Sequence, residues 1–488
     1  MRVGRTAAWM ALAATLSACG GGGTSSGGGA TLTGPTPTPS ATPTPTPTPT
    51  STAAGCTLRE RQDWVLAQMK EWYLFPETLP TSLDPNGYSS VDTYLDALTQ
   101  TARSQNKDRY FTYLTSIAEE DAYYDSGSSA GLGVRLALDT SGRLFITEAF
   151  EGGTGLSAGM DRGTELMAIG TSNDNLRTVT SLYAAGGVDA VSDALGPDTV
   201  GTARTFQFRN TDGTVRTASV AKQEFSLTPV SSRYGAQIIN DGGRQIGYVN
   251  LRTFISTADP ALRSAFASFK AAGVSDVVVD MRYNGGGLIS IAELLTNLLG
   301  GGRSNADVQS YTSFRPEKAS NDDTTTFTVQ PQSVAPTRVA FIGTHSTASA
   351  SEYVINAFTP YLHSASALIG TNTYGKPVGQ IALDRPACDD RLRVISFSLQ
   401  NAARQGAYFN GLAGYVEASC QAGDDIAFQL GDPREASTRA ALDFIEGKPC
   451  TRIATATSGT QSLSKAVRRD LLTPDRPSTA QRETPGLF

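Results

Sequence analysis

Residues 339–352 read Val-Ala-Phe-Ile-Gly-Thr-His-Ser-Thr-Ala-Ser-Ala-Ser-Glu. The first four residues are apolar and largely β-branched or aromatic, which is typical of a strand buried on both faces. Small residues follow, and a helix is predicted from about Ala350, so Ser349 lies at the helix N-terminus. Unpaired amides and the helix dipole favour negative charge there, which suits an attacking serine oxygen. A plain helix cap with small neighbours explains the same residues.

The alternation of strand and helix continues on both sides of this stretch. Apolar strands are predicted at 246–249, 277–280, 367–369 and 392–399, and helices at 260–272 and 288–299. Such alternation predicts an α/β core.

A glycine-rich turn follows the strand that ends at Asp280. Residues 280–287 read Asp-Met-Arg-Tyr-Asn-Gly-Gly-Gly. Glycines let backbone N–H groups approach a bound group closely, as an oxyanion site requires. A tight strand–helix turn is an alternative interpretation. A nucleotide phosphate loop is another, which is disfavoured because no Gly-Lys-Ser/Thr follows.

A second turn, at residues 370–380, carries a candidate base. It reads Gly-Thr-Asn-Thr-Tyr-Gly-Lys-Pro-Val-Gly-Gln. Free lysine has a pKa of about 10.4, so Lys376 would need a water-poor site that lowers its pKa. A neutral amine could then accept a serine proton. Taken alone, a lysine on such a turn is more often a solvated surface residue.

The three segments together resemble the carboxyl-terminal processing, or tail-specific, serine proteases. That family reads Asp-Leu-Arg-x-Asn-x-Gly-Gly, then Ser-Ala-Ser-Ala-Ser-Glu, then Phe-Gly-Lys-Gly, with a glutamine four residues after the lysine. The resemblance covers roughly residues 125–400. It implies a crotonase/ClpP-like α/β spiral core, protein or peptide substrates, and neither metal nor organic cofactor. The implied residues are Ser349 as nucleophile, Lys376 as base, Gln380 to orient the lysine, and the N–H groups of Gly286 and Ala350 as oxyanion donors.

Three positions depart from the family pattern. Thr347 replaces a serine and Tyr374 a phenylalanine, both conservatively, whereas Pro377 replaces a glycine after the lysine. Proline removes an N–H group and stiffens the backbone, which puts strand pairing beside the base in doubt. The rival mechanism is a Ser–His–acid triad that uses His345 or His363. The rival function is a non-catalytic lipoprotein that only binds protein tails.

Residues 126–225 change to short strands and glycine-rich turns. The loop Gly131-Leu132-Gly133-Val134, with the later segment 158–166, resembles a bacterial PDZ domain. The resemblance implies that the loop amides can hold a C-terminal carboxylate. It also implies that the following strand edge can accept an extended peptide. A glycine turn that binds no ligand explains the loop as well.

The N-terminus predicts export. Residues 1–18 read as a signal peptide, with two arginines before an apolar run. Leu16-Ser17-Ala18-Cys19 resembles the lipobox of bacterial lipoproteins, which implies lipidation of Cys19 and a membrane anchor in the cell envelope. Glycine follows the cysteine, which by family rules favours the outer membrane, facing the periplasm. The alternative is an ordinary signal peptide with a chance cysteine. Residues 19–55 form a Gly/Ser and then Pro/Thr linker.

Four further cysteines predict two disulfides in an exported chain, with three possible pairings. Cys388 with Cys420 is preferred, because both lie in the C-terminal region, and this leaves Cys56 with Cys450.

Length and composition complete the expectations. A chain of 488 residues predicts more than one domain. After the linker we expect a helical N-terminal domain at 56–125, the PDZ-like domain at 126–225, the protease core at 226–464 and a disordered tail at 465–488. A net charge of −6 argues against nucleic-acid binding, which favours a basic face. The sequence does not indicate an oligomeric state.

Overall fold

The computed structural model describes residues 54–454 and 468–488. The predicted signal peptide, Cys19 and nearly all of the linker lie outside the described residues. Within the described ranges, no helix combines the length and the apolar character needed to span a membrane.

The core contains a six-stranded sheet whose strands, apart from its antiparallel first member, run parallel. In sheet order these are β10 (Ala236–Asp241), β11 (Arg244–Asn250), β12 (Asp276–Asp280), β15 (Arg338–Gly343), β16 (Ser366–Gly370) and β19 (Ala418–Gln421). Helices α6 (Ala258–Ala271), α7 (Ile289–Leu299) and α8 (Ala350–Leu362) cover one face, and α9 (Ala436–Ile445) covers the other.

Alternate residues of the strands explain these two layers. Val277 and Val279 of β12 join the cluster that contains α6, α7 and α8. Val278 between them joins the cluster that contains α9. Because successive strand residues point to opposite faces, a continuous apolar run requires a cover on both sides. The expected α/β core is therefore confirmed.

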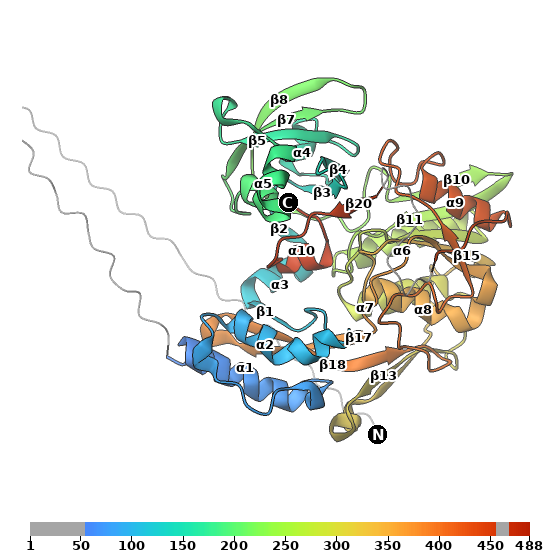
Figure 1. Cartoon of the computed structure of the whole chain (residues 1–488). Helices are drawn as coiled ribbons and strands as arrows, with labels where there is room; N and C mark the ends of the chain where they lie inside the picture. The colour runs from blue at the N-terminus through green and yellow to red at the C-terminus, as the bar shows by residue number, and fades with distance from the viewer. Residues whose placement is uncertain (1–53, 455–467) are drawn as a thin grey trace, which may run out of the picture. The chain divides into compact units, whose positions relative to one another are not determined.

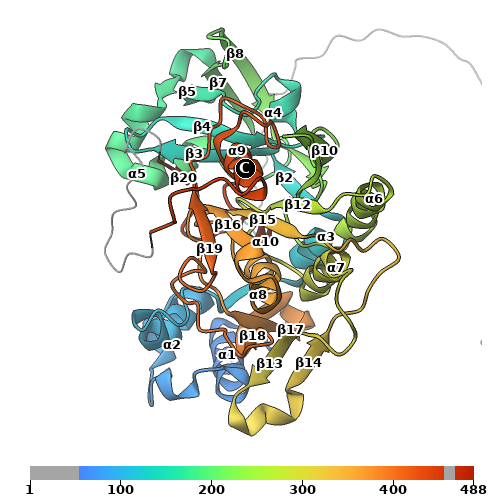
Figure 2. The ribbon, with the colours of Figure 1, turned by 90° about the vertical axis from the view of Figure 1, so that its right-hand side faces the viewer.

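A second sheet joins the N-terminal helices to the core. Its order is β1 (Tyr113–Ser116), β18 (Asp390–Gln400), β13 (Val308–Phe314) and β14 (Asp323–Thr326), and β17 (Val378–Arg385) also pairs with β18. Helices α1 (Leu58–Trp72) and α2 (Val91–Ser104) lie beside these strands in both views (Figures 1 and 2). Met69 and Leu98 share an apolar cluster with Val378 and Val394. The N-terminal helical region is thus present, and it packs directly on the sheet that follows the candidate base.

The β-rich region forms a separate sheet, at the top of Figure 1. Its order is β20 (Arg469–Leu471), β3 (Val134–Asp139), β4 (Leu144–Ala149), β5 (Glu165–Gly170), β7 (Ala203–Arg209) and β8 (Val215–Ala221), with β6 (Arg177–Thr178) beside β5. Its helices are α4 (Thr154–Ser157) and α5 (Val179–Leu195). The chain enters from α3 (Ile117–Ser126) through β2 (Ser128–Gly131) and leaves through its partner strand β9 (Gln223–Ser226).

The preferred disulfide pairing is wrong. The bonds join Cys56 to Cys388 and Cys420 to Cys450, with Cα separations of 5.5 and 5.4 Å. Cys56 directly precedes α1, which packs on β18, and Cys388 lies in the turn that leads into β18. Cys420 lies in β19, and the N–H of the adjacent Gln421 donates to Thr451 O, next to Cys450, at 2.7 Å. Both pairings therefore follow from which strand each segment packs against.

The prediction of a disordered tail is wrong for residues 468–488. This segment contains β20 and α10 (Thr479–Glu483), and it buries Leu472, Leu487 and Phe488. Its backbone pairs with β3, at the edge of the β-rich sheet. This segment is ordered because it pairs with the edge strand β3, an interaction that its own polarity and prolines do not indicate.

Candidate active site

Ser349 lies in a strained turn between β15 and α8. Its φ is +54° and its ψ is −112°, in a region that non-glycine residues rarely adopt. Gly286 lies against it, because a Cβ added to Gly286, whose φ is +123°, would be 2.8 Å from the Cβ of Ser349. Only glycine allows this approach, so the glycine-rich turn lies against the candidate nucleophile.

Two loops at the carboxyl ends of neighbouring parallel strands hold this turn. Thr347 Oγ1 donates to Met281 O at 2.8 Å and accepts from Thr344 N–H at 2.9 Å. Ala348 N–H donates to Asn284 O at 3.0 Å. The hydroxyl of Thr347 therefore joins the two loops.

The predicted oxyanion donors adjoin the Ser349 side chain. Ala350 is the first residue of α8, where amides lack an intrahelical acceptor. Its nitrogen would be 3.3 Å from a Cβ on Gly286. Gly286 N–H donates to Asn284 Oδ1 at 3.0 Å. An oxyanion bound at this amide would replace the Asn284 oxygen.

Lys376 is partly buried on the loop that precedes β17. Its Nζ donates to Gln380 Oε1 at 2.9 Å, and the Gln380 amide donates in turn to Phe111 O. Loss of solvation lowers the pKa of Lys376, and the nearby carboxylate of Glu483 partly opposes this effect. The lysine that the resemblance implies as base is thus partly buried and hydrogen-bonded to Gln380.

Pro377 does not disturb strand pairing beside the lysine. It directly precedes β17, whose first residue, Val378, pairs with Ser398. The carbonyl of Pro377 accepts from Leu399 N–H at 3.0 Å. The missing N–H falls before the strand begins, where proline is tolerated.

Glu352, to which the sequence analysis assigned no role, connects the nucleophile turn to the lysine loop. Its buried carboxylate accepts from Ser349 N–H at 3.0 Å and from Lys376 N–H at 2.8 Å. It also accepts from Gly375 N–H at 2.7 Å and from Thr373 Oγ1 at 2.6 Å. Burial raises the pKa of Glu352, and these four hydrogen bonds oppose that rise. The spacing from Ser349 to Glu352 is that of a helix capping box, which was the available signal.

The loop after α2 supports the lysine from the other side. Asp108 accepts from Phe111 N–H at 2.7 Å and from Thr112 N–H at 3.1 Å. Arg109 Nη2 donates to the carbonyls of Tyr374, at 2.8 Å, and Gly375, at 2.7 Å. The N-terminal helical region thereby supplies the Phe111 carbonyl that holds Gln380 and the Arg109 side chain that holds the loop of the candidate base. No local sequence motif predicts these contacts.

No hydrogen bond joins either histidine to Ser349 in the part of the chain that the structure describes. His363 follows the far end of α8, a helix of 13 residues and therefore about 20 Å long. Its Nδ1 lies 2.7 Å from Glu417 Oε1 at the surface. His345 packs its ring against Tyr374, with centroids 5.3 Å apart.

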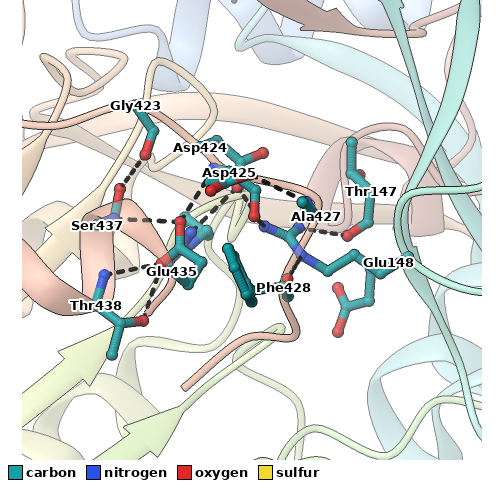
Figure 3. Close-up of polar contacts among 12 residues, drawn as sticks. Thr147, Glu148, Gly423, Asp424, Asp425, Ala427, Phe428, Glu435, Ser437 and Thr438 are labelled. Carbon is teal, nitrogen blue, oxygen red and sulfur yellow. Dashed lines mark hydrogen bonds and ion pairs between the residues drawn. The ribbon is translucent and has the colours of Figure 1, made fainter. Parts of the chain in front are cut away.

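A network of largely buried charges joins the β-rich region to the glycine-rich turn. Figure 3 shows its polar contacts around Asp424 and Glu435. Arg162 Nη2 donates to Asp424 Oδ1 at 2.6 Å, and its Nη1 donates to Thr147 O at 2.6 Å. Arg282 contacts the same Asp424 oxygen at 3.1 Å and Glu435 Oε2 at 2.8 Å. The arginines hold the pKa of Asp424 well below its usual range. The two regions are therefore connected through buried ion pairs.

The loop predicted to bind peptides, Gly131 to Val134, lies where β2 passes into β3. Gly133 has a φ of +67°, a conformation that favours glycine. Leu132 is fully buried in the core of the β-rich region. The N–H and C=O groups of Val134 both pair with Phe488, so a segment of the chain itself occupies the edge of β3.

Comparisons with known proteins identify two matching regions. Residues 245–396 match Peptidase family S41, and residues 60–113 match the Peptidase S41 N-terminal domain. The chain is 30% identical over 164 residues to carboxyl-terminal-processing peptidase 1, chloroplastic, of Arabidopsis thaliana, which is 34% of this chain and 31% of that protein. It is 34% identical over 92 residues to the C-terminal processing peptidase, chloroplastic, of Tetradesmus obliquus, which is 17% of this chain and 20% of that protein. It thus spans about a third or less of these curated relatives.

One solved structure shares the fold over most of the chain. It is a Bacteroides fragilis NCTC 9343 protein assigned to the S41 proteases, with a TM-score of 0.61 and 23% identity. The match covers 79% of this chain and 97% of that one.

Proposed function

We propose that this chain, in which residues 245–396 and 60–113 match models of the S41 peptidases, is a serine endopeptidase with a Ser349–Lys376 dyad. The observation that carries the proposal is that the Glu352 carboxylate accepts hydrogen bonds from the backbone N–H groups of both Ser349 and Lys376. A strained serine at a helix N-terminus and a lysine with a lowered pKa are the two groups that this chemistry needs.

The proposed reaction begins when Ser349 Oγ attacks the carbonyl carbon of a peptide bond and Lys376 Nζ accepts its proton. The N–H groups of Gly286 and Ala350 stabilise the oxyanion that forms. Lys376 then donates the proton to the leaving amine as the C–N bond breaks. Water attacks the acyl-enzyme, its proton passes to Lys376, and the freed Ser349 oxygen is reprotonated.

The test is cleavage of one unfolded protein by wild type, Ser349→Ala and Lys376→Ala, with products identified by mass spectrometry. His345→Ala is the matched control, because His345 lies in the same loop but has no role in the proposed reaction. We expect cleavage by wild type and His345→Ala only. Full activity of Ser349→Ala would refute the dyad, and inactivity of every form would favour the non-catalytic tail-binding alternative.

The proposed setting is the bacterial cell envelope, with Cys19 as a lipid anchor. Two disulfides among the described residues support an oxidising compartment. Incorporation of labelled palmitate into wild type but not into Cys19→Ala would support the anchor. Equal labelling of both would refute it. Substrates are proposed to be unstructured or C-terminal protein segments, which the PDZ-like domain would hold at the edge of β3.

A further inference from the structure

Residues 469–488 cover the edge of β3 to which an extended peptide would add. β20 pairs with residues 137–139, and residues 486–488 pair with residues 134–136. Phe488 N–H donates to Val134 O at 2.9 Å, and Leu136 N–H donates to Gly486 O at 2.8 Å. This is the hydrogen-bond pattern of β-strand addition, supplied here by the chain itself.

Apolar side chains of this segment are buried with the strand. Phe488 is 4% exposed within the cluster that contains Leu132 and Val134. Leu487 is 2% exposed and packs with Phe150. A Cβ on Gly131 would be 2.7 Å from the carbonyl carbon of Phe488, so the glycine loop closely abuts the segment.

The same segment lies against the proposed catalytic residues. Gly285 N–H, next to the proposed oxyanion donor, donates to Glu483 O at 2.9 Å. The Glu483 side chain is buried, and its charge acts on Lys376. A cavity of about 810 Å³ is lined by Lys376 and Ala348 and also by much of the segment from 468 to 485.

One buried arginine links the two contacts. Arg135 of β3 donates through Nη1 to Tyr283 O at 3.0 Å, in the glycine-rich turn, and also to Pro485 O. Gln481 Nε2 donates to Leu487 O at 3.1 Å, which ties α10 to the strand. Pairing at β3 and the contact with Gly285, beside the proposed oxyanion donor, therefore belong to one docked segment.

We infer that residues 478–488 are a tethered occupant of the β3 edge, which a substrate must displace to reach Ser349. The site then takes an extended peptide with two adjacent apolar side chains after a glycine, as in Pro485-Gly486-Leu487-Phe488. A tethered segment competes at an effective concentration on the order of millimolar, so it suppresses weaker peptides. The inference deepens the proposed function, but the binding step can be tested without catalysis.

The test compares two glycine substitutions in the full chain that also carries Ser349→Ala. A Cβ on Gly486 would be 2.9 Å from Leu136 O, so Gly486→Val should undock the segment. Gly213→Val is the matched control, because Gly213 has nearly the same φ, +84° against +82°, and its Cβ would meet no described atom within 4 Å. The probe is a fluorescein-labelled peptide of residues 478–488, and its binding is followed by anisotropy.

We expect Gly486→Val to bind the peptide at least about tenfold more tightly than Gly213→Val. A peptide that carries Leu487→Asp and Phe488→Asp should bind neither. Equal binding by both variants, or none by either, would overturn the inference. If Gly486→Val does not fold, as judged by thermal melting, Leu487→Asp in the full chain replaces it, with the same two outcomes.

The two proposals fail separately. In the chain that retains Ser349, Gly486→Val should also cleave an unfolded protein faster than Gly213→Val. Tighter peptide binding without any cleavage would leave the tethered occupant and refute the peptidase. Cleavage with equal peptide binding would leave the peptidase and refute the occupant.

Discussion

Substitution of Glu352 by glutamine should separate positioning from simple stability. The Glu352 carboxylate accepts four hydrogen bonds, two at each oxygen. Glutamine places an NH₂ group where one oxygen was, and that group faces two donors. Thr373 Oγ1 already accepts from Leu412 N–H at 2.8 Å, so accepting from the amide as well would leave its own O–H without the Glu352 oxygen as acceptor.

The magnitude follows from these contacts. A hydrogen bond to a charged group contributes about 1.5–3 kcal/mol, so losing two costs about 3–6 kcal/mol. Removing a buried charge returns part of this cost. We therefore expect Glu352→Gln to lower the free energy of unfolding by about 2–4 kcal/mol. Because this carboxylate accepts hydrogen bonds from both the Ser349 turn and the Lys376 loop, its replacement should displace these segments. A displacement of about 1 Å should lower kcat by about 100-fold.

The assay measures kcat on a labelled unfolded protein and the free energy of unfolding by urea denaturation. Leu442→Ala is the control, because Leu442 is fully buried on α9, which covers the opposite sheet face from α8. Leu442→Ala should lower the free energy of unfolding by a comparable amount, about 2–5 kcal/mol, but keep its kcat. The positioning role is refuted if Glu352→Gln loses stability as the control does and keeps kcat within about twofold.

Three further outcomes follow from the structure. The kcat/KM should fall as pH drops through the lowered pKa of Lys376, because protonation removes the base. Glu483→Gln deletes a charge that raises this pKa, so the acid limb of the pH profile of kcat/KM should move to lower pH. A move to higher pH would contradict the reasoning. Gln380→Ala removes the acceptor of the lysine, so it should lower kcat by about 10–100-fold with KM nearly unchanged, whereas a change in KM alone would argue against an orienting role. Cys420→Ser opens a loop with a sequence separation of 30, so urea denaturation should show a loss of about 3–4 kcal/mol relative to the oxidised wild type, and an unchanged midpoint would exclude the bond to Cys450.

Much of the core could be predicted, because its signals are local. The strand runs at 277–280 and 339–342 are apolar at every position except Asp280, and each lies in a strand of the sheet covered on both faces. The order and spacing of the glycine-rich turn, Ser349 and Lys376 also identified the loops that the fold brings together. Pro377 does not disturb strand pairing, because β17 begins one residue after it.

The partners of these residues could not be predicted in the same way. Arg109 supports the lysine loop from more than 260 residues away, through contacts with backbone atoms that leave no pattern in side-chain type. The disulfide pairing depends on which strand each cysteine-bearing segment packs against. Sequence proximity favoured the wrong pairs, because it does not report packing.

The sequence by itself therefore predicted four of the six strands of the core sheet, the three helices on one of its faces and the use of four cysteines in two bonds, and its motifs implied the candidate dyad through a family resemblance. Periodicity and short motifs encode these features over a few residues. Only the tertiary structure decided that Glu352 joins the nucleophile turn to the lysine loop and that residues 468–488 are ordered along β3 and beside Lys376. A polar, proline-containing segment has no core of its own. It becomes ordered because β3 offers unpaired backbone groups and the apolar cluster beside it accepts Leu487 and Phe488.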